Sequence, residues 1–170
     1  MEMSNLLVNV LLVLFLSIIP VSEVRGAIPY GILIAKLNPA LVFVVSTLGN
    51  LMIIYPLLAT FNNIENFLLK KFRLRQEKGF LEKILSKYFY FTEKARRKVN
   101  PYIDRYGVMG LTIYTFIPLP FTGAWTATLA AHILGMKRKT AFLSVGLGVV
   151  LASLLVFSMV FLGVSIELFI

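Results

Sequence analysis

The chain has 170 residues, of which 58% are hydrophobic and only 15% are charged, with 17 Lys and Arg against 8 Asp and Glu. A soluble domain carries about 25% charged residues, so this composition excludes an ordinary soluble enzyme and indicates an integral membrane protein. The sequence has no cysteine and one histidine, which excludes disulfides and thiolate metal sites and disfavours a histidine metal site. We therefore expect one all-α membrane domain that is not an enzyme and holds no metal or other cofactor.

The N-terminal third contains two apolar runs, Leu6 to Ile19 and Ala27 to Leu37, separated by a stretch that carries Glu23 and Arg25. As helices these runs would be about 21 Å and 17 Å long, which is short of the roughly 30 Å hydrocarbon core. Prolines and glycines interrupt the stretch from Pro20 to Gly31. We predict a re-entrant hairpin whose broken tip is this stretch. The alternative is a short extramembrane loop between two spans.

The next segment, Ala40 to Phe61, would form a helix of about 33 Å and predicts the first full crossing. Its small and polar residues, among them Asn50, are interpreted as contacts to another helix. Residues 62–106 hold most of the lysines and arginines, so the positive-inside rule places them in the cytoplasm. Apolar residues at helical spacing predict one or two amphipathic helices at the membrane surface there. Binding to lipid headgroups is favoured over binding to nucleic acid.

The second half repeats this order. Val108 to Pro118 would span about 17 Å as a helix and ends in a Pro-rich tip, after which a second short limb runs to Gly135. The basic residues Lys137 to Lys139 follow, and Thr140 to Leu162 would form a full crossing of about 35 Å. We predict a second re-entrant hairpin that returns these basic residues to the cytoplasmic side.

The pattern predicts two inverted repeats, 1–61 and 107–170, each a re-entrant hairpin plus one transmembrane helix, joined by the basic segment 62–106. We expect a multi-pass protein of the cell membrane with both termini outside. Small residues recur at four-residue spacing and would allow close helix packing and a homodimer. These residues are Ala127, Ala131 and Gly135 in one helix, and Ser144, Gly148 and Ala152 in the next.

Two stretches, SEVRGAIPYGI in the first half and FIPLPFTGAWTATLAAHILGM in the second, resemble the small multidrug export protein family. That family is similar to the wider DedA and VTT group of membrane proteins. The resemblance covers nearly the whole chain and implies paired re-entrant hairpins that face each other, with a transport role. Relatives in the DedA group are implicated in moving polyprenyl-phosphate or other phospholipids across the bilayer. They carry an arginine around their second tip, where this chain has Phe116, Ile117 and Pro118, which argues against a lipid-phosphate substrate.

The candidate substrate and proton site joins the two tips, because ionisable residues at membrane depth are costly and usually functional. Glu23 is a candidate acceptor for a proton or cation, and the alternative is a structural salt bridge with Arg25. Arg25 could instead bind an anionic headgroup. The full set is Glu23, Arg25, Pro29, Pro118, Pro120, Thr122, Gly123, Trp125 and His132.

Six of these residues belong to the second half, and four of them have a specific expected role. Thr122 or Gly123 is predicted to cap the returning limb. Thr122 and Trp125 would line the opposite wall of the site, with Trp125 as an apolar or cation-binding face; ordinary packing and an interfacial anchor are the alternative. His132 is either a proton relay or a histidine hydrogen-bonded to a neighbour.

The sequence therefore predicts a membrane transporter, a small multidrug exporter coupled to protons through Glu23. One alternative is flipping or scrambling of polyprenyl-phosphate or another anionic lipid, for which Arg25 and two helix N-termini would supply positive potential. The other alternative is a scaffold that transports nothing. Membrane lipids, protons and a small amphiphilic or lipid-phosphate substrate are the expected partners.

Overall fold

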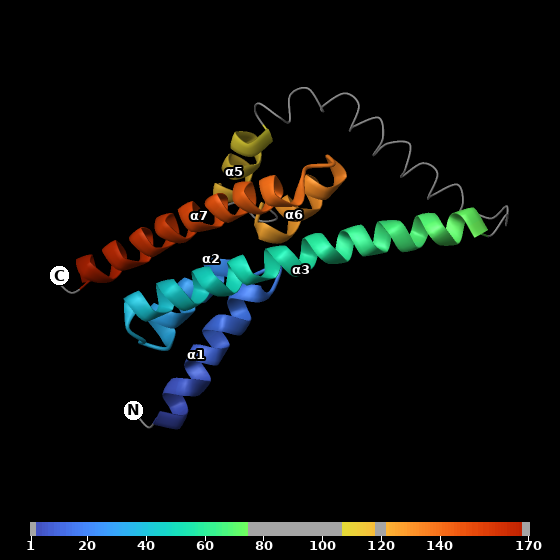
Figure 1. Ribbon diagram of the computed structural model, residues 1–170. Coiled ribbons are helices and arrows are strands. Elements are labelled where there is room, and N and C mark those ends of the chain that lie inside the picture. Colours follow the sequence, from blue (N-terminus) through green and yellow to red (C-terminus); the bar gives the residue numbers. More distant parts are fainter. Residues whose placement is uncertain (1–2, 75–106, 118–121, 168–170) are drawn as a thin grey trace.

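The computed structural model describes residues 3–74, 107–117 and 122–167 (Figure 1). These residues form helices joined by short turns, with no strand among them. The helices in chain order are α1 (Met3–Ile18), α2 (Glu23–Pro29), the π-helix η1 (Tyr30–Ile34), α3 (Pro39–Leu74), α5 (Val108–Phe116), α6 (Ala124–Ile133) and α7 (Arg138–Glu167). The all-helical prediction is confirmed for this part of the chain.

Two long apolar helices, α3 and α7, carry the candidate membrane spans. Their apolar parts are Pro39–Phe61 and Arg138–Gly163, which lie within one or two residues of the predicted crossings. In each, less than half of the most apolar window is buried inside the chain, so large apolar side chains such as Leu48, Met52 and Leu143 face outward. A helix that exposes this much apolar surface is typical of a membrane span.

The helix α3 does not end at the predicted boundary at Phe61 but continues to Leu74. The residues beyond Phe61 are rich in Leu, Lys and Phe and contain no glycine or proline, so nothing there interrupts the helix. The start of the basic segment is thus a continuation of the first long helix. The rest of that segment, with its predicted surface helices, lies outside the described residues.

The first short pair doubles back as predicted, but its break is narrower than the sequence indicates (Figure 1). The chain leaves the helical path only over 19–22, and Pro29 remains inside α2. Directly after Pro29 the helix widens into η1, where the Ala35 amide donates to the Tyr30 carbonyl and the Leu37 amide to the Gly31 carbonyl. Pro29 itself has helical dihedral angles, with a φ of −59° and a ψ of −42°, so the limb continues through it without a break.

The second short pair, α5 and α6, follows the predicted boundaries closely. Gly123 precedes α6 as its N-cap, as the sequence predicts, with no side-chain cap. At the other end Gly135 has a φ of 71°. Its amide donates to His132 and the Met136 amide to Ala131, which is the Schellman arrangement that ends a helix on a left-handed glycine.

The two halves pack in corresponding ways. Helix α1 packs on α3 and α5 packs on α7, while α2 crosses to α7 and α6 crosses to α3. Close approach in each half depends on a glycine: a Cβ at Gly49 would overlap the Ser17 hydroxyl of α1, and one at Gly148 would overlap Thr115 of α5. Both short pairs are therefore held against their own long helix and against the long helix of the other half.

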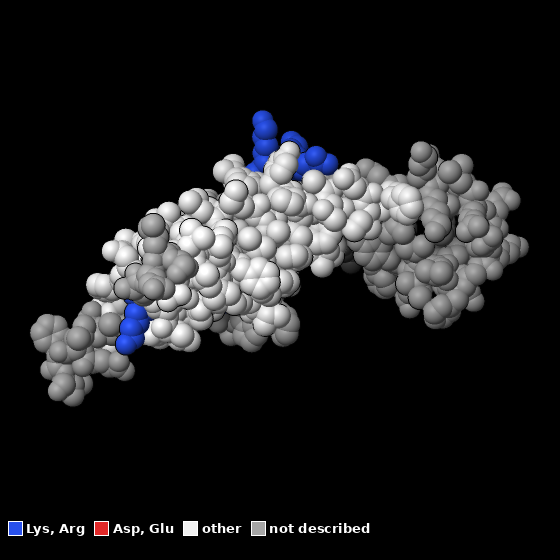
Figure 2. Space-filling model, turned by 90° about the horizontal axis from the view of Figure 1, so that it is seen from below, with Lys and Arg blue, Asp and Glu red and all other residues white. Residues whose placement is uncertain are grey.

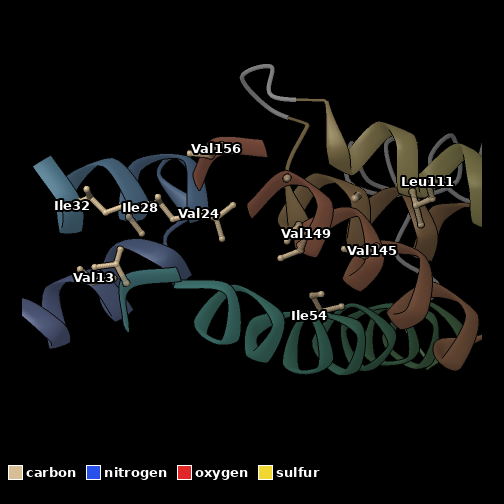
Figure 3. Packing of buried hydrophobic residues seen from close by; sticks show 14 of the residues in the cluster. Val13, Val24, Ile28, Ile32, Ile54, Leu111, Val145, Val149 and Val156 are labelled. Carbon is tan, nitrogen blue, oxygen red and sulfur yellow. The ribbon is translucent and has the colours of Figure 1, made fainter. Parts of the chain in front are cut away.

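The core between these helices is made of small and branched apolar residues (Figure 3). Val13 of α1 lies beside Ile28 and Ile32, while Val145 and Val149 of α7 lie near Ile54 of α3 in the same view. The predicted small-residue positions take part in this packing, because Ala127, Ala131, Ser144, Gly148 and Ala152 are all buried. They are used within one chain, and a homodimer stays a prediction.

Exposed basic residues lie at or just before the start of both long helices. Figure 1 shows the start of α1 and the end of α7 at one end of the molecule, opposite the far end of α3. Figure 2 shows Lys and Arg side chains in two places separated by uncharged surface. Lys36, before α3, is exposed, and so are Lys137, Arg138 and Lys139 at the start of α7.

Candidate functional site

The carboxylate of Glu23 lies at the N-terminus of α6, on the opposite hairpin. Glu23 is the first residue of α2 and its side chain is 4% exposed. Its Oε1 accepts a hydrogen bond of 3.4 Å from the backbone N–H of Trp125, in the first turn of α6. The first N–H groups of a helix have no partner within the helix and attract negative charge, so this contact joins two segments that are 102 residues apart in the sequence.

Two backbone features hold the carboxylate there. Glu23 has a φ of 49°, a left-handed value that residues other than glycine rarely adopt and that costs about 1–3 kcal/mol. Gly123 is buried directly against it, and a Cβ at this position would overlap both carboxylate oxygens. A glycine is thus required at position 123 for the carboxylate to reach the α6 N-terminus.

The guanidinium of Arg25 binds the other limb of the second hairpin. Its Nη2 donates to the carbonyl of Thr115 at 3.2 Å and to that of Ile117 at 2.8 Å. These carbonyls belong to the last turn of α5, where backbone acceptors have no partner within the helix. The same nitrogen also contacts the Thr122 hydroxyl at 3.2 Å.

Each charge therefore lies at the helix end of opposite sign: the carboxylate at the start of α6 and the guanidinium at the end of α5. A partly buried charge at a matching helix terminus is worth up to about 2 kcal/mol. The sequence alternative was a salt bridge between Glu23 and Arg25 that holds the first tip. In the structure these hydrogen bonds cross to the second hairpin and tie the two tips together.

Thr122 and Trp125 add further links. The Thr122 hydroxyl donates to the Ile117 carbonyl at 2.6 Å, which joins the residues that precede and follow 118–121. The indole Nε1 of Trp125 donates to the Ile18 carbonyl at 2.9 Å, at the last residue of α1. Trp125 thus binds the first hairpin twice, through its ring to α1 and through its backbone to Glu23.

Asn50 of α3 is a buried polar residue beside this contact. Its side chain has no exposed surface. Neither the oxygen nor the nitrogen of that carboxamide has a hydrogen-bond partner among the described residues. An unpaired buried polar group costs about 1–3 kcal/mol, so Asn50 calls for an explanation beyond helix packing.

The other predicted site residues lie elsewhere or are not described. Pro29 is the last residue of α2, directly before η1, and lies about 9 Å along the helix from Glu23. His132 is buried near the opposite end of α6, where its ring lies 5.9 Å from that of Phe61. Pro118 and Pro120 fall in the tip 118–121, outside the described residues.

The site thus brings together Glu23, Arg25, Thr122, Gly123 and Trp125 of the predicted set. Sequence reasoning missed the carbonyls at Ile18, Thr115 and Ile117, because every residue carries a carbonyl and only the fold selects which one is used. It noted Asn50 as a polar residue in an apolar span but assigned it to packing. In the described ranges no three His, Asp or Glu side chains gather in a way that could hold a metal ion.

A family model described as "Putative small multi-drug export protein" matches residues 23–155. The matched region begins at Glu23 and includes every side chain of the contact between the tips. Searches of curated proteins and of solved structures find no match to this chain.

Proposed function

Because the chain belongs to the small multi-drug export protein family, we propose that it exports small amphiphilic or cationic compounds across the membrane in exchange for protons at Glu23. The family and the two long apolar helices together indicate an integral membrane protein. Proton exchange at Glu23 is the specific part of the proposal. The carboxylate alternates between an ionised form that binds the α6 N-terminus and a protonated form that releases it.

One observation carries this proposal: an acidic side chain only 4% exposed is held by the other half of the chain at the meeting point of two short hairpins. A buried carboxylate can change its charge only when water or substrate reaches it. The contact between the halves therefore depends on whether Glu23 carries a proton. This dependence is what a transporter needs to couple proton binding to a change in shape.

We propose that the two halves are inverted repeats and that both hairpins are re-entrant. The support is the matching pattern of helix packing in the two halves and the length of the limbs, since α5 and α6 have 9 and 10 residues. Helices of this length cover only about 15 Å, half of the hydrocarbon core. The exposed basic residues Lys137, Arg138 and Lys139 support a cytoplasmic start of α7 by the positive-inside rule, and the proposed topology then has both termini outside.

The site is less suited to binding an anionic lipid than to binding a cationic or neutral compound. Phosphate binding would use the Arg25 guanidinium and the α6 N-terminus. The Arg25 guanidinium already donates to carbonyls of α5, and the α6 N-terminus already donates to Glu23. An anion must therefore displace the Glu23 carboxylate to bind at the α6 N-terminus. For this reason we prefer a cationic or neutral amphiphile, and we keep lipid translocation as an outcome of the test.

The test is export of a fluorescent cationic dye from liposomes that contain the purified protein, with an imposed pH gradient. We expect wild type to move the dye only when the gradient is present, and Glu23→Gln to abolish that movement. Lys36→Gln removes an exposed charge and serves as the matched control, with export equal to wild type.

Two outcomes contradict the proposal. If folded Glu23→Gln protein exports the dye at the wild-type rate, Glu23 does not carry the exchange. If wild type moves no dye but scrambles a labelled polyprenyl phosphate in the same liposomes, the lipid alternative replaces the exporter. Inactivity toward both, with normal folding, favours the scaffold.

A further inference from the structure

Thr47 and Asn50 are two buried polar side chains on one face of α3. They are three residues apart, so helical geometry brings their Cβ atoms to about 5–6 Å from each other. Thr47 is 7% exposed and Asn50 has no exposed surface. The Thr47 hydroxyl and both polar atoms of the Asn50 carboxamide lack a hydrogen-bond partner among the described residues. Buried polar groups nearly always have a partner, so two adjacent unpaired groups indicate a ligand that both contact.

Thr47 differs in this respect from other serines and threonines of the helices. Hydroxyls at six described positions donate to the carbonyl four residues earlier in their own helix, namely Ser46, Thr115, Thr128, Ser144, Ser153 and Ser158. For Thr47 that carbonyl belongs to Phe43, which already accepts a contact of 3.3 Å from the Ser46 hydroxyl. The Thr47 hydroxyl is therefore available to a group outside its own helix.

Close helix packing does not require a polar side chain at the position of Asn50. Asn50 follows Gly49, on which α1 packs, and Val149 follows Gly148, on which α5 packs. Val149 is 1% exposed, so an apolar side chain fills the corresponding place in the second half. The polar side chain on α3 thus has a role that packing alone does not explain.

Asn50 is also the central residue of the candidate span Pro39–Phe61, and Thr47 lies about one turn nearer the start of that span. At the middle of a membrane, polar groups that are left unpaired are especially costly. Transporters commonly bind their substrates at this depth. The pair is therefore placed where a bound molecule both stabilises the span and can be part of transport.

The chemistry of the two side chains selects the ligand. Thr47 Oγ1 donates and accepts, Asn50 Oδ1 accepts and Nδ2 donates. A cation is repelled by the Nδ2 hydrogens and an anion by Oδ1, whereas a hydroxyl group both donates and accepts. We propose that Thr47 and Asn50 bind one hydroxyl group, which donates to Oδ1 of Asn50 and accepts from the hydroxyl of Thr47. It belongs to a water molecule or to an amphiphilic substrate, and the second source rests on the proposed export function.

The first test is thermal unfolding of purified protein in detergent without substrate. Thr47→Val keeps the shape and removes the hydroxyl. Loss of an unpaired buried hydroxyl raises stability, whereas loss of a partner of bound water lowers it. If water is bound, we expect Thr47→Val and Asn50→Leu each to melt about 2–4 °C below wild type. Thr47→Ser should melt like wild type.

Ser46→Ala is the matched control, because Ser46 is buried on the same helix and its hydroxyl donates to the Val42 carbonyl of that helix at 2.6 Å. We expect its melting temperature to stay close to that of wild type. An equal fall in Ser46→Ala would show a general effect of polar groups on α3 and would overturn the proposal. If Asn50→Leu does not fold, Thr47→Val decides the result.

The second test compares two probes by calorimetric titration: benzyltrimethylammonium, and its analogue in which a hydroxyethyl group replaces one methyl group. If the bound hydroxyl belongs to a substrate, wild type should bind the hydroxyl compound about threefold to tenfold more tightly, the effect of one hydrogen bond. Thr47→Val and Asn50→Leu should bind both compounds alike, with melting temperatures at or above that of wild type.

The proposal is wrong if both variants are at least as stable as wild type and wild type does not distinguish the two probes. A crystal structure that resolves water also overturns it if a protein group, the Glu23 carboxylate included, occupies the place of the hydroxyl. These results are separate from the proposed function. A hydroxyl preference without dye export supports the site and contradicts the exporter, and Glu23-dependent export with neither effect at Thr47 and Asn50 does the reverse.

Discussion

Gly123 leaves open the space that the carboxylate of Glu23 occupies, since a Cβ on residue 123 would overlap both carboxylate oxygens. The two residues belong to different hairpins and are 100 positions apart in the sequence. One missing methyl group thus allows an acidic side chain to reach the start of α6. The relationship predicts how the contact fails when either partner changes.

Gly123→Ala should destabilise the protein by about 2 kcal/mol or more, because the methyl group pushes the Glu23 carboxylate away from the Trp125 N–H. Thermal unfolding in detergent measures the change. Gly110→Ala is the control, since a Cβ there meets nothing within 4 Å and alanine favours the helix. Equal melting temperatures for Gly123→Ala and wild type would show that the close approach does not exist.

Thr122→Val should weaken the second tip, because the hydroxyl both donates to the Ile117 carbonyl and contacts Arg25. A loss of about 1–2 kcal/mol is expected for two hydrogen bonds, one of them to a charged group. Thr122→Ser keeps the hydroxyl and should retain most of the stability. The account fails here if the serine variant is as unstable as the valine variant.

Arg25→Lys should lower the thermal stability of the protein although it keeps the positive charge. One terminal nitrogen of the guanidinium reaches the carbonyls of Thr115 and Ile117, and the lysine side chain is one bond shorter, so its ammonium cannot take the same position. We expect unfolding at a lower temperature for both Arg25→Lys and Arg25→Ala. Full recovery by lysine would mean that only the charge near the end of α5 matters.

Trp125 provides a direct measure of depth, since it is the only tryptophan in the chain. If the tips meet inside the membrane, brominated lipids that carry bromine deep in the acyl chains should quench its fluorescence more than lipids labelled near the headgroup. Stronger quenching by the shallow label would place Trp125 at the interface and the hairpins outside the hydrocarbon core.

The chain has no cysteine, so the single variants Lys36→Cys and Lys137→Cys can each test which side of the membrane a residue faces. A membrane-impermeant thiol reagent added outside should label the cysteine at position 36 and not the one at position 137. The reverse labelling would contradict the proposed topology.

Hydropathy was sufficient to predict the long helices, because a run of apolar residues ended by charge is a strong signal. The prolines and glycines gave too wide a break in the first hairpin, because Pro29 stays helical as the last residue of α2 and the turn covers only 19–22. Glu23 and Arg25 were found because charge is conspicuous in an apolar segment. Their partners could not be predicted, because a backbone carbonyl about 90 residues away is selected only by packing.

The central claim is that Glu23 exchanges protons for substrate, and substrate-driven proton movement tests it most directly. Liposomes containing the protein and a trapped pH-sensitive dye, with no imposed gradient, receive a cationic substrate on one side. The account predicts that the substrate gradient drives protons in the opposite direction in wild type and in Lys36→Gln, and that Glu23→Gln abolishes this movement. Equal proton movement in folded Glu23→Gln protein would contradict it.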